Sequence, residues 1–190
     1  ISDDSQRDTV ARIDEISSNL IEEIQSQKTL ASAENGTLEP TRQIIVSDDL
    51  IRRVIAHYEK LDLARNKALA TAPFSDSFSL ISDETILRRI LGNMVKNALE
   101  AANPGETVTI GCREENGDAV FDVHNPGVMP DEAQSKIFSR FFSTKGDGRG
   151  LGTYSMKLLA EGYLGGQVSF TSTEEGGTTF TVSIPVANSV

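Results

Sequence analysis

The chain has 190 residues, and its 28 acidic and 18 basic residues give a formal net charge of −10, which argues against non-specific nucleic-acid binding. Its 38% apolar and 24% charged content fits a soluble globular domain with an appendage, and no apolar run of membrane-spanning length occurs. Cys112 is the only cysteine, so an internal disulfide and a cysteine-cluster zinc site are excluded. It falls in an alternating strand pattern, which predicts a buried structural thiol.

The N-terminal segment, residues 1–36, is expected to be one long helix that ends at Asn35-Gly36. Its apolar residues recur at helical spacing, and they include Val10, Ile13, Leu20, Ile24 and Ala31. A solitary helix has nothing of its own to bury such a stripe against. We favour a dimerisation helix, and the alternative is a helix that lies on its own domain.

The remaining residues, 37–190, predict a domain of alternating helices and strands. The expected elements are a strand at 43–46, a helix from Ser47-Asp48, a strand at 78–81, a helix at 84–102 capped by Ser82 or Asp83, a hairpin of 107–113 and 119–123, a short helix from 131 through 138, a helix from Thr153, and a hairpin of 167–173 and 178–186. This order predicts an α/β two-layer sandwich in which helices cover one face of a mixed sheet.

A glycine-rich stretch, residues 141–166, stands before the helix at Thr153. Gly146, Gly148, Gly150 and Gly152 alternate with other residues, among them Lys145 and Arg149. Backbone N–H groups at a helix start, together with the helix dipole, suit an anion, so the stretch is a candidate phosphate cradle. The alternative is a surface loop in which the glycines are linkers. A dinucleotide fingerprint and a P-loop are both disfavoured, because neither spacing occurs after an apolar strand.

Three polar features elsewhere are candidates for the same site. Asn93 and Asn97 are four residues apart on one predicted helix, and amide oxygens are suitable Mg²⁺ ligands, although such a pair can equally be polar surface. Asn125-Pro-Gly127 follows a strand, where a side chain can read a purine edge or simply form a turn. Gly177-Thr178 opens the last strand, where a hairpin turn is the alternative.

Residues from about 44 to 186 resemble the ATP-binding domain of sensor histidine kinases, within the Bergerat fold shared with gyrase, Hsp90 and MutL. Five motifs appear in the family's order: residues 91–101 resemble the N box, 125–127 the first glycine box, 137–142 the F box, 148–153 the second glycine box and 177–180 the last glycine box. Residues 20–38 are similar to the second dimerisation helix and its linker.

The resemblance implies a nucleotide site between the N-box helix and a lid. Asn93 and Asn97 would act as the catalytic residues and hold Mg²⁺, and Asn125 and Gly127 would lie beside the adenine. The nucleotide contacts implied by the motifs and the lid are Lys96, Phe142, Thr144, Lys145, Arg149, Gly150, Leu151, Gly152 and Thr178. Gly150 and Gly152 are the glycines we expect to touch phosphate, so their alanine variants should lose ATP binding and keep the fold.

The chain departs from the family pattern at several positions. Asn125 replaces the usual aspartate, Val128-Met129 stands where a second glycine is usual, and the lid is short. Asn93 stands where the ATPase branches of the fold carry a glutamate, which predicts slow hydrolysis. His57 and His124 both lack the His-Glu/Asp-x-x-x-Pro setting of a phosphate acceptor, so we expect the acceptor histidine upstream of Ile1.

These features predict a protein-histidine kinase that transfers the ATP γ-phosphate to a histidine on an upstream helix. The expected partners are that helix, a response regulator receiver domain and a second copy in the full-length protein, with no nucleic acid. We expect a cytoplasmic domain, whose parent could be anchored in the inner membrane. The alternatives are a non-catalytic ATP sensor or scaffold, and a protein-serine kinase or anti-sigma module on the same fold.

Overall fold

The computed structural model describes residues 3–142 and 150–186, in two compact units, Ile1–Glu39 and Pro40–Val190. The first unit is helix α1, Asp3–Glu34, which ends where Gly36 adopts a φ of +68° and the Thr37 N–H donates to Ser32 O at 2.9 Å. Its side chains Val10, Ile13 and Leu20 are more than half exposed. The dimerisation role of this helix remains a prediction. Within the described residues, no helix is long and apolar enough to cross a membrane.

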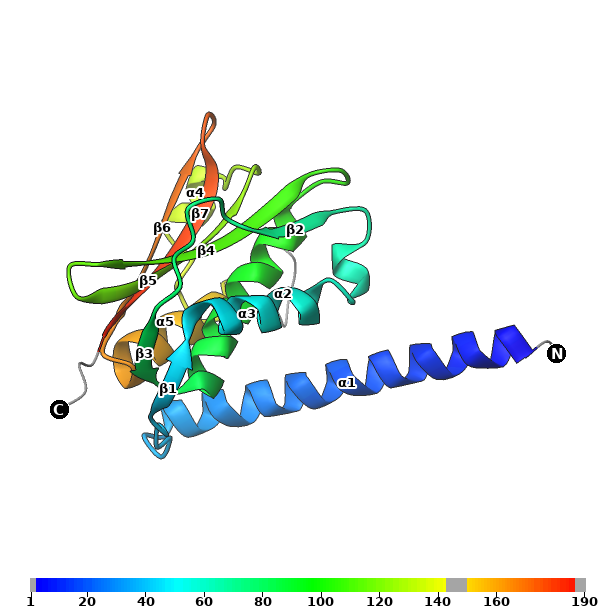
Figure 1. The fold of residues 1–190 in the computed structure, drawn as a ribbon, viewed down its shortest axis with the longest axis horizontal. Coiled ribbons are helices and arrows are strands. Elements are labelled where there is room, and N and C mark those ends of the chain that lie inside the picture. Colours follow the sequence, from blue (N-terminus) through cyan, green and yellow to red (C-terminus); the bar gives the residue numbers. More distant parts are fainter. Residues whose placement is uncertain (1–2, 143–149, 187–190) are drawn as a thin grey trace. The chain divides into compact units, whose positions relative to one another are not determined.

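The second unit is built on a five-stranded mixed sheet in the order β2-β4-β5-β7-β6 (Figure 1). Its strands are β2 Ala68–Thr71, β4 Thr107–Glu115, β5 Asp118–Asn125, β6 Gln167–Thr173 and β7 Gly177–Pro185. Only the β2–β4 pair is parallel, and the register of β5 and β7 places Asn125 opposite Thr178. Two motifs distant in sequence are therefore brought to one end of the sheet.

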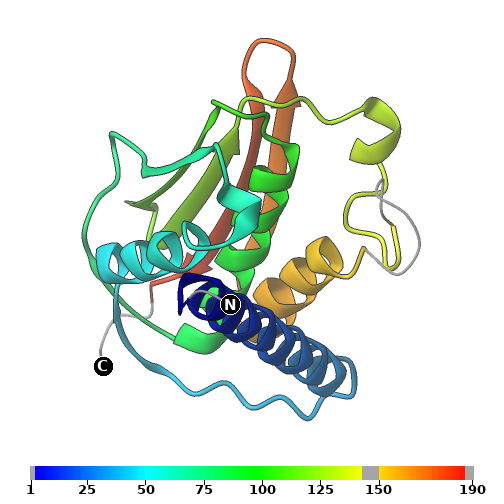
Figure 2. The ribbon, with the colours of Figure 1, turned by 90° about the vertical axis from the view of Figure 1, so that its right-hand side faces the viewer.

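Helices cover one face of this sheet, as the sequence predicts (Figure 2). They are α2 Ser47–Tyr58, α3 Glu84–Ala101 and α5 Gly152–Tyr163, with a 3₁₀ turn at Asp62–Ala64 and the short helix α4 at Asp131–Gln134. Strands β1 Gln43–Val46 and β3 Ser79–Ser82 form a separate antiparallel ribbon. Helix α3 packs against β4, β5, α2 and α5, so it lies at the centre of the unit.

The buried face of α3 follows from its sequence. The predicted apolar arc is fully or almost fully buried, and it comprises Leu87, Leu91, Met94, Val95, Ala98 and Ala102. The Asp83 side chain caps the helix by accepting the Ile86 N–H at 2.9 Å, and its second oxygen accepts the Thr41 N–H at 2.7 Å. Asn93 and Asn97 are half-buried at the edge of the arc.

Two expectations about elements are wrong. Strand β2 was not expected, because Ala-Leu-Ala-Thr has little β propensity and pairs with residues about forty positions later. The short helix was expected to reach Phe138, but α4 ends at Gln134. Beyond it, Ser139 N bonds Lys136 O and Phe142 N bonds Ser139 O, which are three-residue turns rather than helical bonds.

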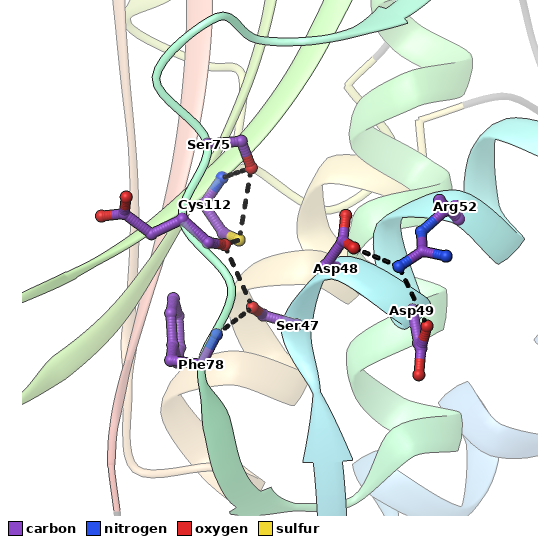
Figure 3. Close-up of polar contacts among 8 residues, drawn as sticks. Ser47, Asp48, Asp49, Arg52, Ser75, Phe78 and Cys112 are labelled. Carbon is purple, nitrogen blue, oxygen red and sulfur yellow. Dashed lines mark hydrogen bonds and ion pairs between the residues drawn. The ribbon is translucent and has the colours of Figure 1, made fainter.

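A buried hydrogen-bond network joins α2 to the segment before β3 (Figure 3). The helix start at Ser47 is confirmed, but its cap is Val46, and the fully buried Ser47 hydroxyl accepts the Phe78 N–H at 3.1 Å instead. Cys112 is buried, as predicted, and its thiol donates to Asp76 O at 3.0 Å. These contacts fix residues 75–78 against the edge of β4.

We expect Ser47→Ala to lower the free energy of unfolding by about 1–3 kcal/mol, because the half-buried Phe78 N–H loses the hydroxyl that accepts its hydrogen bond. Chemical denaturation measures the loss. Ser77→Ala is the matched control at an exposed position of the same segment, and it should change stability by less than about 0.5 kcal/mol. Equal losses for the two variants would contradict the structural role of Ser47.

Candidate functional site

The first half of the candidate site lies between α3 and the start of α5. The Asn97 Nδ2 atom is buried and has no hydrogen-bond partner among the described residues, which is unusual for an amide. One turn earlier, Asn93 Oδ1 lies 3.6 Å from the position that a Cβ on Gly152 would take. Asn93, one of the two predicted metal-side residues, therefore faces the first residue of α5.

The N-terminus of α5 suits an anion. Leu151 is the cap residue, and no side chain caps the helix in the described part of the chain. The N–H groups of a first helical turn have no intrahelical partner, and the helix dipole places positive charge there. Since Gly152 has no side chain, the turn is open toward Asn93. The arrangement can bind phosphate oxygens through backbone N–H groups.

Gly150 has a structural reason to be glycine. Its φ is +109°, and a Cβ there would come within 2.2 Å of the Phe142 carbonyl oxygen. Alanine at this position would therefore displace the backbone at Phe142, contrary to our expectation that the fold would stay intact. Gly152 does not have a positive φ, and a Cβ there would meet only the Asn93 amide at ordinary contact distance, so it is the position at which a glycine substitution can test phosphate binding.

The aromatic residues before Gly150 are partly exposed. Phe141 has a φ of +64° and its ring lies 4.8 Å from the Arg140 guanidinium carbon, while Phe142 is half-buried. Lys96 is exposed on α3. Thr144, Lys145 and Arg149 were also predicted to contact the nucleotide, and all three lie outside the described residues.

The second half of the site is the turn after β5. Asn125 is 2% exposed and its Nδ2 donates to Gly127 O at 3.2 Å, and the Thr178 hydroxyl donates to the same carbonyl at 2.8 Å. A Cβ on Gly127 would lie 2.9 Å from Asn125 Nδ2 and 3.0 Å from Ala101 O, so glycine is required where the turn meets the end of α3.

The end of α3 is itself held by polar contacts. Lys67 Nζ donates to Leu99 O at 2.5 Å, which complements the negative end of the helix dipole. The Glu106 carboxylate accepts the Asn103 backbone N–H at 2.6 Å and its side-chain amide at 3.2 Å, and these bonds lower the pKa of Glu106. Asn125, Gly127 and Thr178 thus lie beside a fixed helix end.

Ser172 is a residue of this turn that the sequence analysis missed. Its hydroxyl contacts Thr178 Oγ1 at 2.8 Å and accepts the Met129 N–H at 2.8 Å. One signal was available: Ser172 occupies an inward position of β6, in the same alternation as the apolar Val168 and Phe170. A hydroxyl in that series is expected to have a buried partner.

A metal ion at this site would have to be coordinated by side-chain amides and by the bound phosphate compound. Within residues 3–142 and 150–186, no three His, Cys, Asp or Glu side chains gather where they could hold an ion. A hard cation that also takes phosphate oxygens and waters as ligands fits the amide oxygens of Asn93 and Asn97, whereas the unpartnered Asn97 Nδ2 is a donor and not a metal ligand.

Comparison with known proteins shows the family of this chain. Residues 82–188 match the family described as histidine kinase-, DNA gyrase B-, and HSP90-like ATPase. Over 163 residues the chain is 29% identical to the sensor histidine kinase CusS of Escherichia coli (strain K12), which covers 82% of this chain and 33% of CusS. The chain thus spans about a third of the length of the curated relatives it matches.

Solved structures show the same likeness. The catalytic domain of histidine kinase ThkA superposes with a TM-score of 0.68 at 29% identity, covering 78% of this chain and 97% of that domain. ThkA in complex with response regulator protein TrrA gives a TM-score of 0.69 at 24% identity, covering 88% of this chain and 49% of the ThkA chain, and this second likeness concerns the fold alone.

We predict that Gly152→Ala weakens binding of a non-hydrolysable ATP analogue at least roughly tenfold, because the methyl group enters the space between α5 and Asn93. Calorimetric titration measures the affinity, and thermal unfolding checks that the fold is unchanged. Gly162→Ala is the matched control in the same helix, where the nearest atom would be a Leu158 methyl at 3.8 Å. Unchanged affinity in Gly152→Ala would contradict the prediction that the phosphates bind at the N-terminus of α5.

Proposed function

Because this chain belongs to the family of histidine kinase-, DNA gyrase B- and HSP90-like ATPases, we propose that it is the ATP-binding catalytic domain of a two-component sensor histidine kinase. The family match covers more than half of the chain, and the relatives named above are sensor histidine kinases. The observation that carries the proposal is the open N-terminus of α5, which faces Asn93 at the position of Gly152.

In this proposal the nucleotide binds across both halves of the site. The first turn of α5, including Leu151 and Gly152, donates backbone N–H groups to the phosphates. Asn125, Gly127 and Thr178 receive the adenine base at the end of α3. The remaining nucleotide contacts expected from the motifs are retained as predictions: Lys96, Phe142, Thr144, Lys145, Arg149 and Gly150.

We further propose that Mg²⁺ accompanies the nucleotide and is held by Asn97 and Asn93. The support is the position of Asn97 one turn from Asn93, both half-buried on the same helix, where their amide oxygens are suitable hard ligands. When bound, the ion would neutralise charge on the phosphates, which is the main requirement of phosphoryl transfer. The amides themselves orient the ligand and carry no proton to transfer near neutral pH.

The acceptor in this proposal is a histidine on a helix upstream of Ile1. An imidazole nitrogen forms the P–N bond while the bond from the γ-phosphorus to the bridging oxygen breaks, and ADP leaves. Because Asn93 is an amide, the site has no carboxylate at that position to activate water. ATP is thereby spared for the histidine.

The partners follow from the same proposal. The exposed apolar stripe of α1 supports pairing with the upstream helix and with a second copy of the protein. ThkA has been solved with response regulator TrrA, which supports a receiver domain as the next phosphate acceptor. We propose that the domain works in the cytoplasm, where ATP is available.

The proposed function predicts very slow ATP hydrolysis by this chain and phosphorylation only when a histidine-bearing helix is supplied. Radiolabelled γ-phosphate distinguishes the two fates, because acid-labile, base-stable label on protein indicates phosphohistidine. Turnover is compared for the chain alone and for a version extended upstream through the acceptor helix. Brisk hydrolysis by the chain alone would contradict the proposal, and absence of ATP binding would favour a scaffold.

A further inference from the structure

The turn from Asn125 to Met129 is held at two points by hydroxyl groups of neighbouring strands. In its middle Gly127 O accepts from Thr178 at 2.8 Å, and at its end the Met129 N–H donates to Ser172 at 2.8 Å. The two hydroxyls contact each other at 2.8 Å. Thr178 is 4% exposed and Asn125 is 2% exposed, while Gly127, Met129 and Ser172 are half-buried.

The chemistry of the end groups sets the direction of every bond in this network. A carbonyl can only accept, so Thr178 gives its single proton to Gly127 O. The proton between the two hydroxyls must then come from Ser172. An amide N–H can only donate, so Ser172 accepts from Met129. The chain of bonds therefore runs from Met129 through Ser172 and Thr178 to Gly127.

The same carbonyl also fixes the Asn125 amide. Gly127 O can accept from the Asn125 amide nitrogen at 3.2 Å, whereas an amide oxygen there would face another acceptor. The orientation of this amide thus follows from its hydrogen bonds. One of the two N–H groups of the amide is used by Gly127, which fixes the amide in one orientation and keeps its oxygen as an acceptor for a ligand.

We propose that Ser172 is a positioning residue that acts with Thr178 to hold Gly127, so that Asn125 must be an amide and is held with its oxygen as the acceptor for the base. This inference rests on the proposed ATP-binding function and adds to it a residue and a chemical requirement. An acceptor oxygen matches the 6-amino group of adenine and repels the 6-oxo group of hypoxanthine or guanine. The aspartate that is usual in related domains is unsuited to this chain.

The unsuitability of a carboxylate follows from the same bonds. Asn125→Asp replaces the donor to Gly127 with an oxygen that must either be protonated or face the carbonyl at close range. Burial and the lack of a donor both favour the protonated form. The residues that adjoin the Asn125 side chain carry no charge, and they are Gly127, Ala101 and Thr178. The neighbouring titratable residue, His124, bonds Gly176 O at 3.0 Å instead.

The first test needs no nucleotide. Asn125→Asp and wild type are unfolded thermally from about pH 4 to about pH 8, with Asn116→Asp, at the exposed β4–β5 turn, as the matched control. A carboxyl group whose folded pKa is raised contributes stability below its unfolded pKa and loses it as pH rises through the folded pKa. We expect the melting-temperature deficit of Asn125→Asp to grow with pH, and that of Asn116→Asp to stay small. A deficit that is flat or shrinks with rising pH would overturn the amide requirement.

The second test measures base selectivity as the ratio of dissociation constants for ITP and ATP. Wild type should favour ATP at least roughly tenfold, since an acceptor facing the 6-oxo group is left unpaired. Ser172→Ala should lower this ratio at least about threefold, because a released amide can present either end to the base. Ser169→Ala, on the exposed face of the same strand, should leave the ratio unchanged.

The two tests separate the possible failures. If the wild type binds neither nucleotide, the proposed function is refuted. The pH dependence of the melting temperature would still test whether Asn125 must be an amide. If Ser172→Ala lowers stability but keeps the wild-type ratio, Ser172 is structural only and the positioning role is overturned. A fall of the ratio in Ser172→Ala alone supports it.

Discussion

The packing of α3 between the sheet and its neighbouring helices is the constraint on which the candidate site depends. Its apolar face is buried from Leu87 to Ala102, so the helix can neither rotate nor slide without exposing large side chains. That fixed position leaves Asn93 and Asn97 at the edge of the buried face. It also places the C-terminal end of the helix, at Ala101, against Gly127. The position of α3 therefore fixes both halves of the site.

Close approach of backbone explains why the motifs contain glycine, and the individual glycines do different things. Gly127 and Gly150 are required because a Cβ would meet main-chain atoms at 3.0 Å or less. Gly152 meets nothing within ordinary contact distance except the Asn93 amide. The first two therefore shape the backbone, whereas Gly152 leaves space that a phosphate group can use.

Much of the fold was predictable because local signals and burial agree. The Asn116-Gly117 turn has positive φ at both residues and joins the strands expected on either side, and the arc of α3 is buried as its spacing indicates. Strand β2 could not be predicted, since its parallel pairing with β4 is set by tertiary contacts rather than by Ala68–Thr71 themselves.

The candidate site was predictable in its residue types and less so in its connections. Asn93, Asn97, Asn125 and Gly127 were proposed from spacing and from resemblance to family motifs, and their role stays a prediction. The hydrogen bonds among Ser172, Thr178 and Gly127 join two strands and a turn, and no local pattern records such a bond. For the same reason the helix start at Ser47 was predictable, whereas the bond of its hydroxyl to Phe78, thirty-one positions away, was not.

The most direct test of the account is a map of backbone amide shifts by NMR as the chain is titrated with a non-hydrolysable ATP analogue and Mg²⁺. The account predicts that the amides of Asn97, Gly127 and Gly152 shift together with one dissociation constant. The amides of Gly105 and Asn116, which lie in open turns, should stay in place. Shifts confined to β1, β3 or the outer face of the sheet, with Gly127 and Gly152 unmoved, would contradict a nucleotide site between α3, α5 and the β5 turn.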